Sequence, residues 1–202
     1  MPLQNRVTPF GEIIATPERG AFMGNRGCLH NERRELVRPF AVKRWIICLL
    51  EYKGIRLEIM KPGRYTQLFF LDEATALAAG HRPCALCRRE AYREFTTLWQ
   101  TAIAPIHSID EVDALLHRER VSPLETRRAR LDTLPDGCFI ALERKPYLIQ
   151  GDCLAEWTAG GYIKRVARPA DREVSVLTPP SLVRIIAAGY VPQIHQSVTA
   201  LF

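Results

Sequence analysis

The chain has 202 residues, of which 47% are hydrophobic and 25% are charged. This composition is typical of a globular protein and excludes collagen-like and low-complexity architectures. The longest strictly apolar stretches, residues 45–50 and 68–71, are much shorter than the roughly 18 residues of a membrane span, so we expect no membrane association. The N-terminus lacks the basic and apolar pattern of a secretion signal, which predicts a cytoplasmic protein.

The formal net charge of +6 favours a polyanionic partner without requiring one. Thiols stay reduced in the cytoplasm, so the cysteines are better candidates for metal ligation, catalysis or burial than for disulfides. There are six of them, at positions 28, 48, 84, 87, 138 and 153.

The N-terminal part of the chain combines turn signals with a predicted hairpin. Residues 1–27 contain two turn-like segments, PERG and GNRG, around a short apolar run. Residues 43–52 and 55–60 have strand-like patterns separated by Lys53 and Gly54, which predicts an antiparallel pair. In this register the side chain of Cys48 points inward.

The next segment has clear boundary signals. Residues 66–71 predict a short strand that ends at Asp72, and Asp72 is a good N-cap for an Ala-rich helix that stops at Gly80. Pro83 prevents continuation of this helix. The pair Cys84 and Cys87 then leads into a second helix over residues 88–99, where aromatic and apolar residues recur at helical spacing.

The C-terminal half predicts a β-rich module after a boundary. An amphipathic helix over residues 110–120 is followed by a basic linker, and strands are expected at 139–143, 147–150 and 173–177. Thr178 is the expected cap of a last helix that ends at Gly189. We therefore predict an α+β fold, with a small zinc-stapled antiparallel-sheet domain and flanking helices (1–100), a helical basic linker (101–132) and a β-rich α+β module (133–202).

The C-x-x-C motif at positions 84 and 87 is the sharpest local signal. Two thiolates at this spacing can bind one ion, and the following helix dipole and nearby arginines favour their charged form. A zinc site needs two more ligands, for which Cys28, His30, Cys48, Cys138 and Cys153 are candidates. A redox pair is a weaker alternative, because such a motif is expected after a βαβ-type strand. An incidental pair of half-buried thiols is a second alternative.

Residues 66–90 resemble the zinc-binding N-terminal domain of the Ada DNA-repair methyltransferase family. The likeness consists of an aromatic strand, an acidic-capped Ala-rich helix, and the run AAGHRPCALC with a following basic residue. In that family four cysteines hold zinc, and one of the first pair, a C-x-x-x-C, accepts a methyl group from a DNA phosphotriester. No C-x-x-x-C precedes residue 66 here, and Cys48 alone lies close enough to occupy its place.

The expected metal ligands are therefore His30, Cys48, Cys84 and Cys87, with Cys28 as the rival of His30. Four protein ligands would close the coordination shell and argue against metal-assisted hydrolysis. A zinc-bound thiolate is itself a nucleophile, which leaves methyl transfer to Cys48 as an alternative activity.

We expect the protein to bind zinc and nucleic acid, with DNA favoured by the resemblance. The phosphates would meet a basic surface around the metal, so binding should weaken steeply as salt rises. A third hypothesis is a zinc-stabilised protein-interaction module that ignores nucleic acid. The basic surface is expected to contain Arg33, Arg34, Arg82, Arg88 and Arg89.

Overall fold

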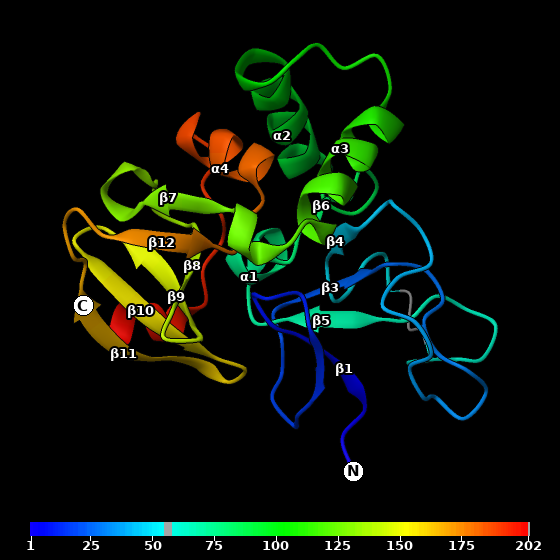
Figure 1. The fold of residues 1–202 in the computed structure, drawn as a ribbon. Coiled ribbons are helices and arrows are strands. Elements are labelled where there is room, and N and C mark those ends of the chain that lie inside the picture. The colour runs from blue at the N-terminus through cyan, green and yellow to red at the C-terminus, as the bar shows by residue number, and fades with distance from the viewer. Residues whose placement is uncertain (55–57, 202) are drawn as a thin grey trace.

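The computed structural model of the chain describes residues 1–54 and 58–201. Within these residues it contains two six-stranded β-sheets and four α-helices (Figure 1). The predicted α+β class is confirmed. No helix among the described residues is long and apolar enough to span a membrane.

The first sheet has the strand order β2-β1-β5-β3-β4-β6. It is mixed rather than antiparallel as expected, because β1 pairs with β5 and β4 pairs with β6 in parallel. The expected partner of residues 43–52 includes residues 55–57, which lie outside the described residues; β4 pairs with β3 and β6. The six strands are β1 (Gln4–Val7), β2 (Ile13–Ala15), β3 (Phe22–Asn25), β4 (Ile46–Cys48), β5 (Leu68–Phe70) and β6 (Arg82–Pro83).

The helices follow the sequence signals closely. The Asp72 carboxylate accepts a hydrogen bond from the backbone N–H of Thr75 at 2.8 Å and caps the first helix, as predicted. Gly80, which follows the C-cap residue Ala79 of this helix, has a φ of +80°, a conformation that suits glycine. The four helices are α1 (Glu73–Ala78), α2 (Arg89–Ala102), α3 (Ile109–Val121) and α4 (Pro180–Ala187).

The second sheet is antiparallel in all its pairs and has the order β11-β10-β9-β8-β12-β7. The expected Thr178 cap of α4 is wrong, because the Thr178 hydroxyl accepts a hydrogen bond from Phe139 N and Pro179 occupies the cap position. Three short 3₁₀ helices are η1 (Leu124–Thr126), η2 (Leu131–Thr133) and η3 (Gln196–Leu201). The strands are β7 (Arg128–Arg130), β8 (Phe139–Leu142), β9 (Lys145–Gln150), β10 (Cys153–Thr158), β11 (Gly161–Ala167) and β12 (Glu173–Val176).

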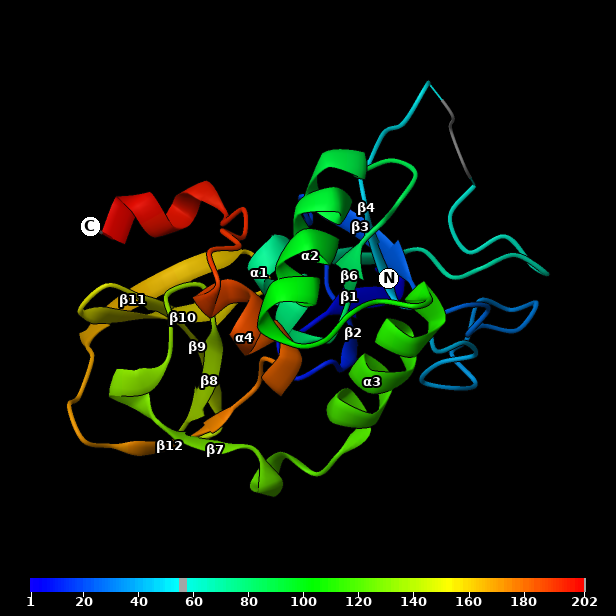
Figure 2. The same cartoon turned by 90° about the horizontal axis from the view of Figure 1, so that it is seen from above.

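One hydrophobic core connects the two sheets. The same cluster contains Phe70 of the first sheet, Leu116 of α3, Ile140 of the second sheet and Ile185 of α4. Figure 2 shows α2 and α4 adjacent to each other between the sheets, and η3 lying along β11. The division into segments at residues 100 and 132 stays a prediction, although the burial of Leu116 shows that α3 contributes to the common core.

Two neighbouring acidic residues join α1 to the C-terminal segment. The Asp72 carboxylate accepts a hydrogen bond from His195 N at 3.0 Å, and the Glu73 carboxylate accepts from the Tyr190 hydroxyl at 2.5 Å and from Gln193 N at 3.1 Å. Both carboxylates are 1% exposed. Because buried carboxylates without partners are strongly destabilising, these contacts fix the C-terminal segment against α1.

Candidate metal centre

The pairing of β4 with β6 places two cysteines side by side. In this parallel ladder Ile46 lies opposite Arg82 and Ile47 opposite Pro83. Cys48 and Cys84 are the next residues of the two segments, and Cys84 N donates a hydrogen bond to Ile47 O at 2.9 Å. The carboxyl ends of parallel strands meet at the same edge of a sheet, so both thiols reach one place.

A tight turn brings the third thiol to the same place. The backbone N–H of Arg88 donates to Cys84 O at 3.1 Å and closes the turn over residues 84–88. Leu86 N donates to the Cys84 sulfur at 3.4 Å. Cys87 therefore faces back toward Cys84, directly before the N-terminus of α2, where the helix dipole favours negative charge.

The three thiols form a group that fits a metal ion. The Sγ atoms of Cys48, Cys84 and Cys87 all lie within 4.8 Å of one another. Two thiolates bound to one tetrahedral zinc ion at 2.3 Å have their sulfurs about 3.8 Å apart. The sulfurs are thus close to the spacing that such an ion requires, and their softness suits zinc or copper(I).

Hydrogen bonds among the three thiols, together with burial, shift their pKa values in different directions. The pKa of Cys84 is lowered to about 5, first because the Cys48 thiol donates to its sulfur. The same interaction, together with burial, raises the pKa of Cys48, and burial raises the pKa of Cys87. Without a metal the group therefore favours one thiolate at Cys84, and a divalent cation would supply the charge that stabilises three.

The structure does not bring His30 or Cys28 into this group. The His30 ring is buried, with Nδ1 2.6 Å from the Thr66 hydroxyl and Nε2 3.2 Å from Lys61 O. The Cys28 sulfur lies 3.7 Å from His30 O. In the part of the chain that the structure describes, no fourth His, Cys, Asp or Glu donor joins the three thiols.

Two of the five expected nucleic-acid contacts are interior residues. Arg82 forms a two-pronged ion pair with Asp113, with Nε–Oδ1 and Nη2–Oδ2 distances of 2.8 and 2.7 Å. Arg88 Nη1 lies 2.7 Å from Glu73 Oε1. These arginines are 3% and 7% exposed, so their charges are used inside the fold rather than on a basic surface. This differs from the sequence expectation, since local sequence does not reveal the distant carboxylates.

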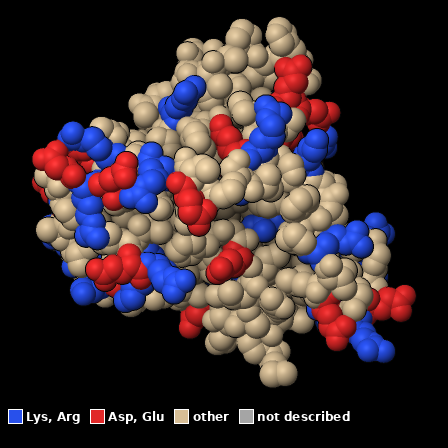
Figure 3. Space-filling model, viewed as in Figure 1, with Lys and Arg blue, Asp and Glu red and all other residues tan. Residues whose placement is uncertain are grey.

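The other three expected contacts are exposed. Arg33 and Arg89 lie at the surface, and Arg34 forms an exposed ion pair with Glu58 at 3.0 Å. On the face shown in Figure 3, basic and acidic side chains are interspersed rather than gathered in one basic patch. Of the predicted nucleic-acid interface, only these three arginines of the N-terminal half are therefore exposed at the surface.

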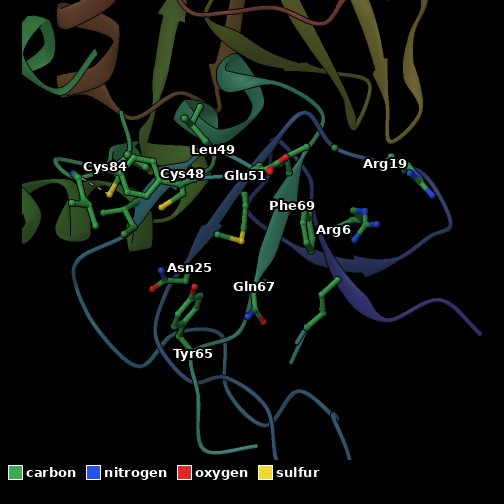
Figure 4. A pocket seen from close by; sticks show the side chains of 18 residues that line it. Arg6, Arg19, Asn25, Cys48, Leu49, Glu51, Tyr65, Gln67, Phe69 and Cys84 are labelled. Atoms are coloured by element: carbon green, nitrogen blue, oxygen red, sulfur yellow. Dashed lines mark hydrogen bonds between the residues drawn. The ribbon is translucent and has the colours of Figure 1, made fainter. Parts of the chain in front are cut away.

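The thiols form part of the wall of a large pocket that the sequence analysis did not anticipate. The cavity has a volume of about 870 Å³ and extends over the first sheet and the loops at its edge. Figure 4 shows Cys48 and Cys84 at one end and Arg6 and Arg19 at the other, with Phe69 between them. No local motif marks these residues, because strand pairing across the sheet assembles the pocket.

Tyr65 also lines the pocket near the sulfurs. Burial raises the pKa of its phenol, and electrostatic interaction with the cysteines raises it further. A tyrosine hydroxyl keeps its proton at neutral pH even at its ordinary pKa of about 10, so Tyr65 can donate a hydrogen bond. The candidate centre consists of three thiols that face a pocket, with a polar donor nearby.

Comparisons of the chain with protein families, curated proteins and solved structures found no match.

Proposed function

We propose that the protein binds Zn²⁺ through Cys48, Cys84 and Cys87 and uses the surrounding N-terminal half to bind nucleic acid. The observation that carries the metal assignment is the mutual approach of the three sulfurs within 4.8 Å. When bound, zinc supplies positive charge that keeps the thiols deprotonated and crosslinks β4 to the turn before α2.

The support for nucleic-acid binding is the charge and the resemblance. The chain has a net charge of +6, and the exposed Arg33 and Arg89 lie on the half that contains the thiols. Residues 66–90 resemble the zinc-binding domain of a DNA-repair family. Arginine side chains at the surface contact phosphates, and such contacts release counterions on binding.

Metal content measured on purified variants tests the ligand assignment. Wild-type protein is expected to hold one zinc ion per chain, and Cys48→Ser, Cys84→Ser and Cys87→Ser are each expected to lose most of it. His30→Ala and Cys28→Ser serve as controls, because neither residue belongs to the group of three sulfurs. Full zinc retention by the Cys84→Ser variant contradicts the assignment.

Fluorescence anisotropy with labelled DNA and RNA at several salt concentrations tests the second part. Arg33→Gln and Arg89→Gln should each weaken binding and reduce the salt slope by about one unit. Arg172→Gln, an exposed arginine beside the second sheet, is the matched control. Affinity that does not change with salt would contradict binding through phosphate contacts, and no binding at any salt concentration would leave the protein as a metal-stabilised interaction module.

The position of the thiols in a pocket favours a second candidate, the acceptance of an alkyl group by Cys48. In this reaction the thiolate attacks the methyl carbon of a DNA phosphotriester, a sulfur–carbon bond forms, the carbon–oxygen bond breaks, and a phosphodiester leaves. Intact-mass analysis after incubation with methylated DNA should show one added methyl group on wild-type protein and none on Cys48→Ser. Cys153→Ser, a substitution in the second sheet, should react like wild type.

A further inference from the structure

The described residues supply three donors to the candidate metal centre, one fewer than a four-coordinate zinc ion would need. Zinc in proteins takes four ligands, and structural sites are closed by four protein donors. The closed shell expected from the sequence depended on His30, whose ring nitrogens face Thr66 and Lys61 instead. Among the described residues the group ends with three sulfurs, which is the ligand count of an open site.

The three thiols face a pocket that has apolar residues in its wall. Met23, Ile46 and Phe69 are among the residues that line it, and Phe69 lies between the cysteines and the two arginines (Figure 4). At the rim, Leu49 and Leu86 are 38% and 68% exposed, although large apolar side chains are usually buried. Exposed apolar residues gathered around a cavity mark a ligand site, because a ligand with an apolar body covers them.

The far end of the pocket carries two positive charges. The Arg6 guanidinium stacks on the Phe69 ring at 4.6 Å, and burial followed by the nearby Arg19 charge lowers the pKa of Arg6. Arg6 Nε donates a hydrogen bond to Glu18 O at 2.6 Å and Nη1 donates to Asn5 Oδ1 at 2.5 Å, which leaves Nη2 for a ligand. Neither Arg6 nor Arg19 forms an ion pair with a carboxylate of the described residues. Glu51 is the acidic residue on the pocket wall. An anionic group placed between Arg6 and Arg19 would relieve their repulsion.

We infer that the fourth metal position binds the sulfur of a small organic thiol acid, whose apolar chain crosses Phe69 and whose acidic group meets Arg6 and Arg19. The inference rests on the metal-binding part of the proposed function. A thiol is the donor that matches three soft thiolates. On binding it releases its proton to solvent, and its sulfur forms a bond to the metal at the side open to the pocket.

Cobalt(II) substitution of the full-length protein provides the test, because cobalt–sulfur charge-transfer absorption reports the number of bound sulfurs. Addition of 6-mercaptohexanoate should raise this absorption in the proportion of four bonds to three. The uncharged 6-mercaptohexanol has the same length and should bind about tenfold more weakly, since it lacks a charge-assisted contact to arginine. Shorter mercapto acids identify the span that fits the pocket.

Arg19→Gln should weaken 6-mercaptohexanoate binding about tenfold and leave 6-mercaptohexanol unchanged. Arg38→Gln, an exposed arginine outside the pocket, is the matched control. A cobalt spectrum that no thiol changes shows that the centre is closed and overturns the inference. Equal affinity for the two probes refutes the claim that Arg6 and Arg19 bind the acidic group. Failure of cobalt to bind at all is a different result, which refutes the metal assignment itself.

Discussion

The hydroxyl of Tyr162 in β11 donates a hydrogen bond to the Asp72 carboxylate at 2.7 Å, although 90 residues separate the two in the chain. Asp72 also caps α1, so one carboxylate serves the end of a helix and the contact with the second sheet. Trp157 of β10 reinforces this contact, because its ring N–H donates to the Thr75 hydroxyl at 3.0 Å. The two halves of the chain are joined by a buried polar network as well as by the apolar core.

Tyr162→Phe should reduce the free energy of unfolding by about 1.5–3 kcal/mol, the usual contribution of a hydrogen bond to a charged group. Urea unfolding measures this loss. The matched control is Tyr147→Phe, which removes a hydrogen bond to Glu156 within the second sheet, where the exposed Lys145 also pairs with that carboxylate. An equal loss in both variants would show that the hydrogen bond to Asp72 contributes no more to the free energy of unfolding than the hydrogen bond to Glu156.

Stability should fall at alkaline pH because of two tyrosines. Burial, followed by the charges of Asp72 and Glu73 respectively, raises the pKa of Tyr162 and of Tyr190. The unfolded chain releases these phenolic protons near pH 10, while the folded chain retains them. Their contribution is therefore fully present below about pH 10 and is lost as the pH rises further.

The double variant Tyr162→Phe with Tyr190→Phe should show a smaller decrease in stability between about pH 9 and about pH 11. Urea unfolding at several pH values measures this slope. A slope that equals that of wild type would mean that other groups cause the alkaline loss.

Asp113→Asn should destabilise the protein by about 3–5 kcal/mol, because it leaves the Arg82 charge buried without its partner. Both side chains of this pair are 3% exposed. Asp110→Asn is the control: Asp110 pairs with Arg44 at the surface, where such pairs contribute about 1 kcal/mol or less. Thermal unfolding of the two variants should separate them clearly, and a similar midpoint for both would refute the assignment of Arg82 as an interior structural charge.

In metal-free protein, iodoacetamide should modify Cys84 before the other cysteines. Its pKa is lowered to about 5, so it is the thiolate of the group at neutral pH. Burial raises the pKa of Cys138 to about 12, and this side chain is 0% exposed, so it should stay unmodified in the folded state. Peptide mapping measures the order, and zinc should slow the reaction at Cys84. Faster labelling of Cys138 would contradict the assigned protonation states.

Elements with local signals were predicted well. Asp72, Gly80 and the apolar spacing of residues 88–99 determine the bounds of α1 and α2 through contacts within a few residues. The strands β1 to β3 were not predicted, because they are short. In addition, β1 and β3 both pair with β5, which is distant in sequence, as the pairing of Arg6 with Phe69 shows. Pairing of this kind leaves no periodic pattern in so few residues.

The residues of the candidate site were likewise predicted where the signal is local and missed where it depends on distant contacts. The spacing of Cys84 and Cys87 is a local pattern, and the resemblance pointed to Cys48, so the three sulfurs that meet were all among the expected ligands. His30 was expected from its place upstream of the strand. Its ring is held by Thr66, a residue 36 positions away, and no sequence pattern reveals a competing hydrogen bond of that range.

The two-residue strand β6 is the last strand on its side of the first sheet. A metal ion bound by Cys48 and Cys84 would hold this short strand in place beside β4. Removal of the metal by a chelator would then allow β6 to separate from β4. The backbone groups of β4 would be exposed as a new sheet edge, which can pair with another molecule. The centre would in this way protect the protein from aggregation, and light scattering after chelator treatment should rise.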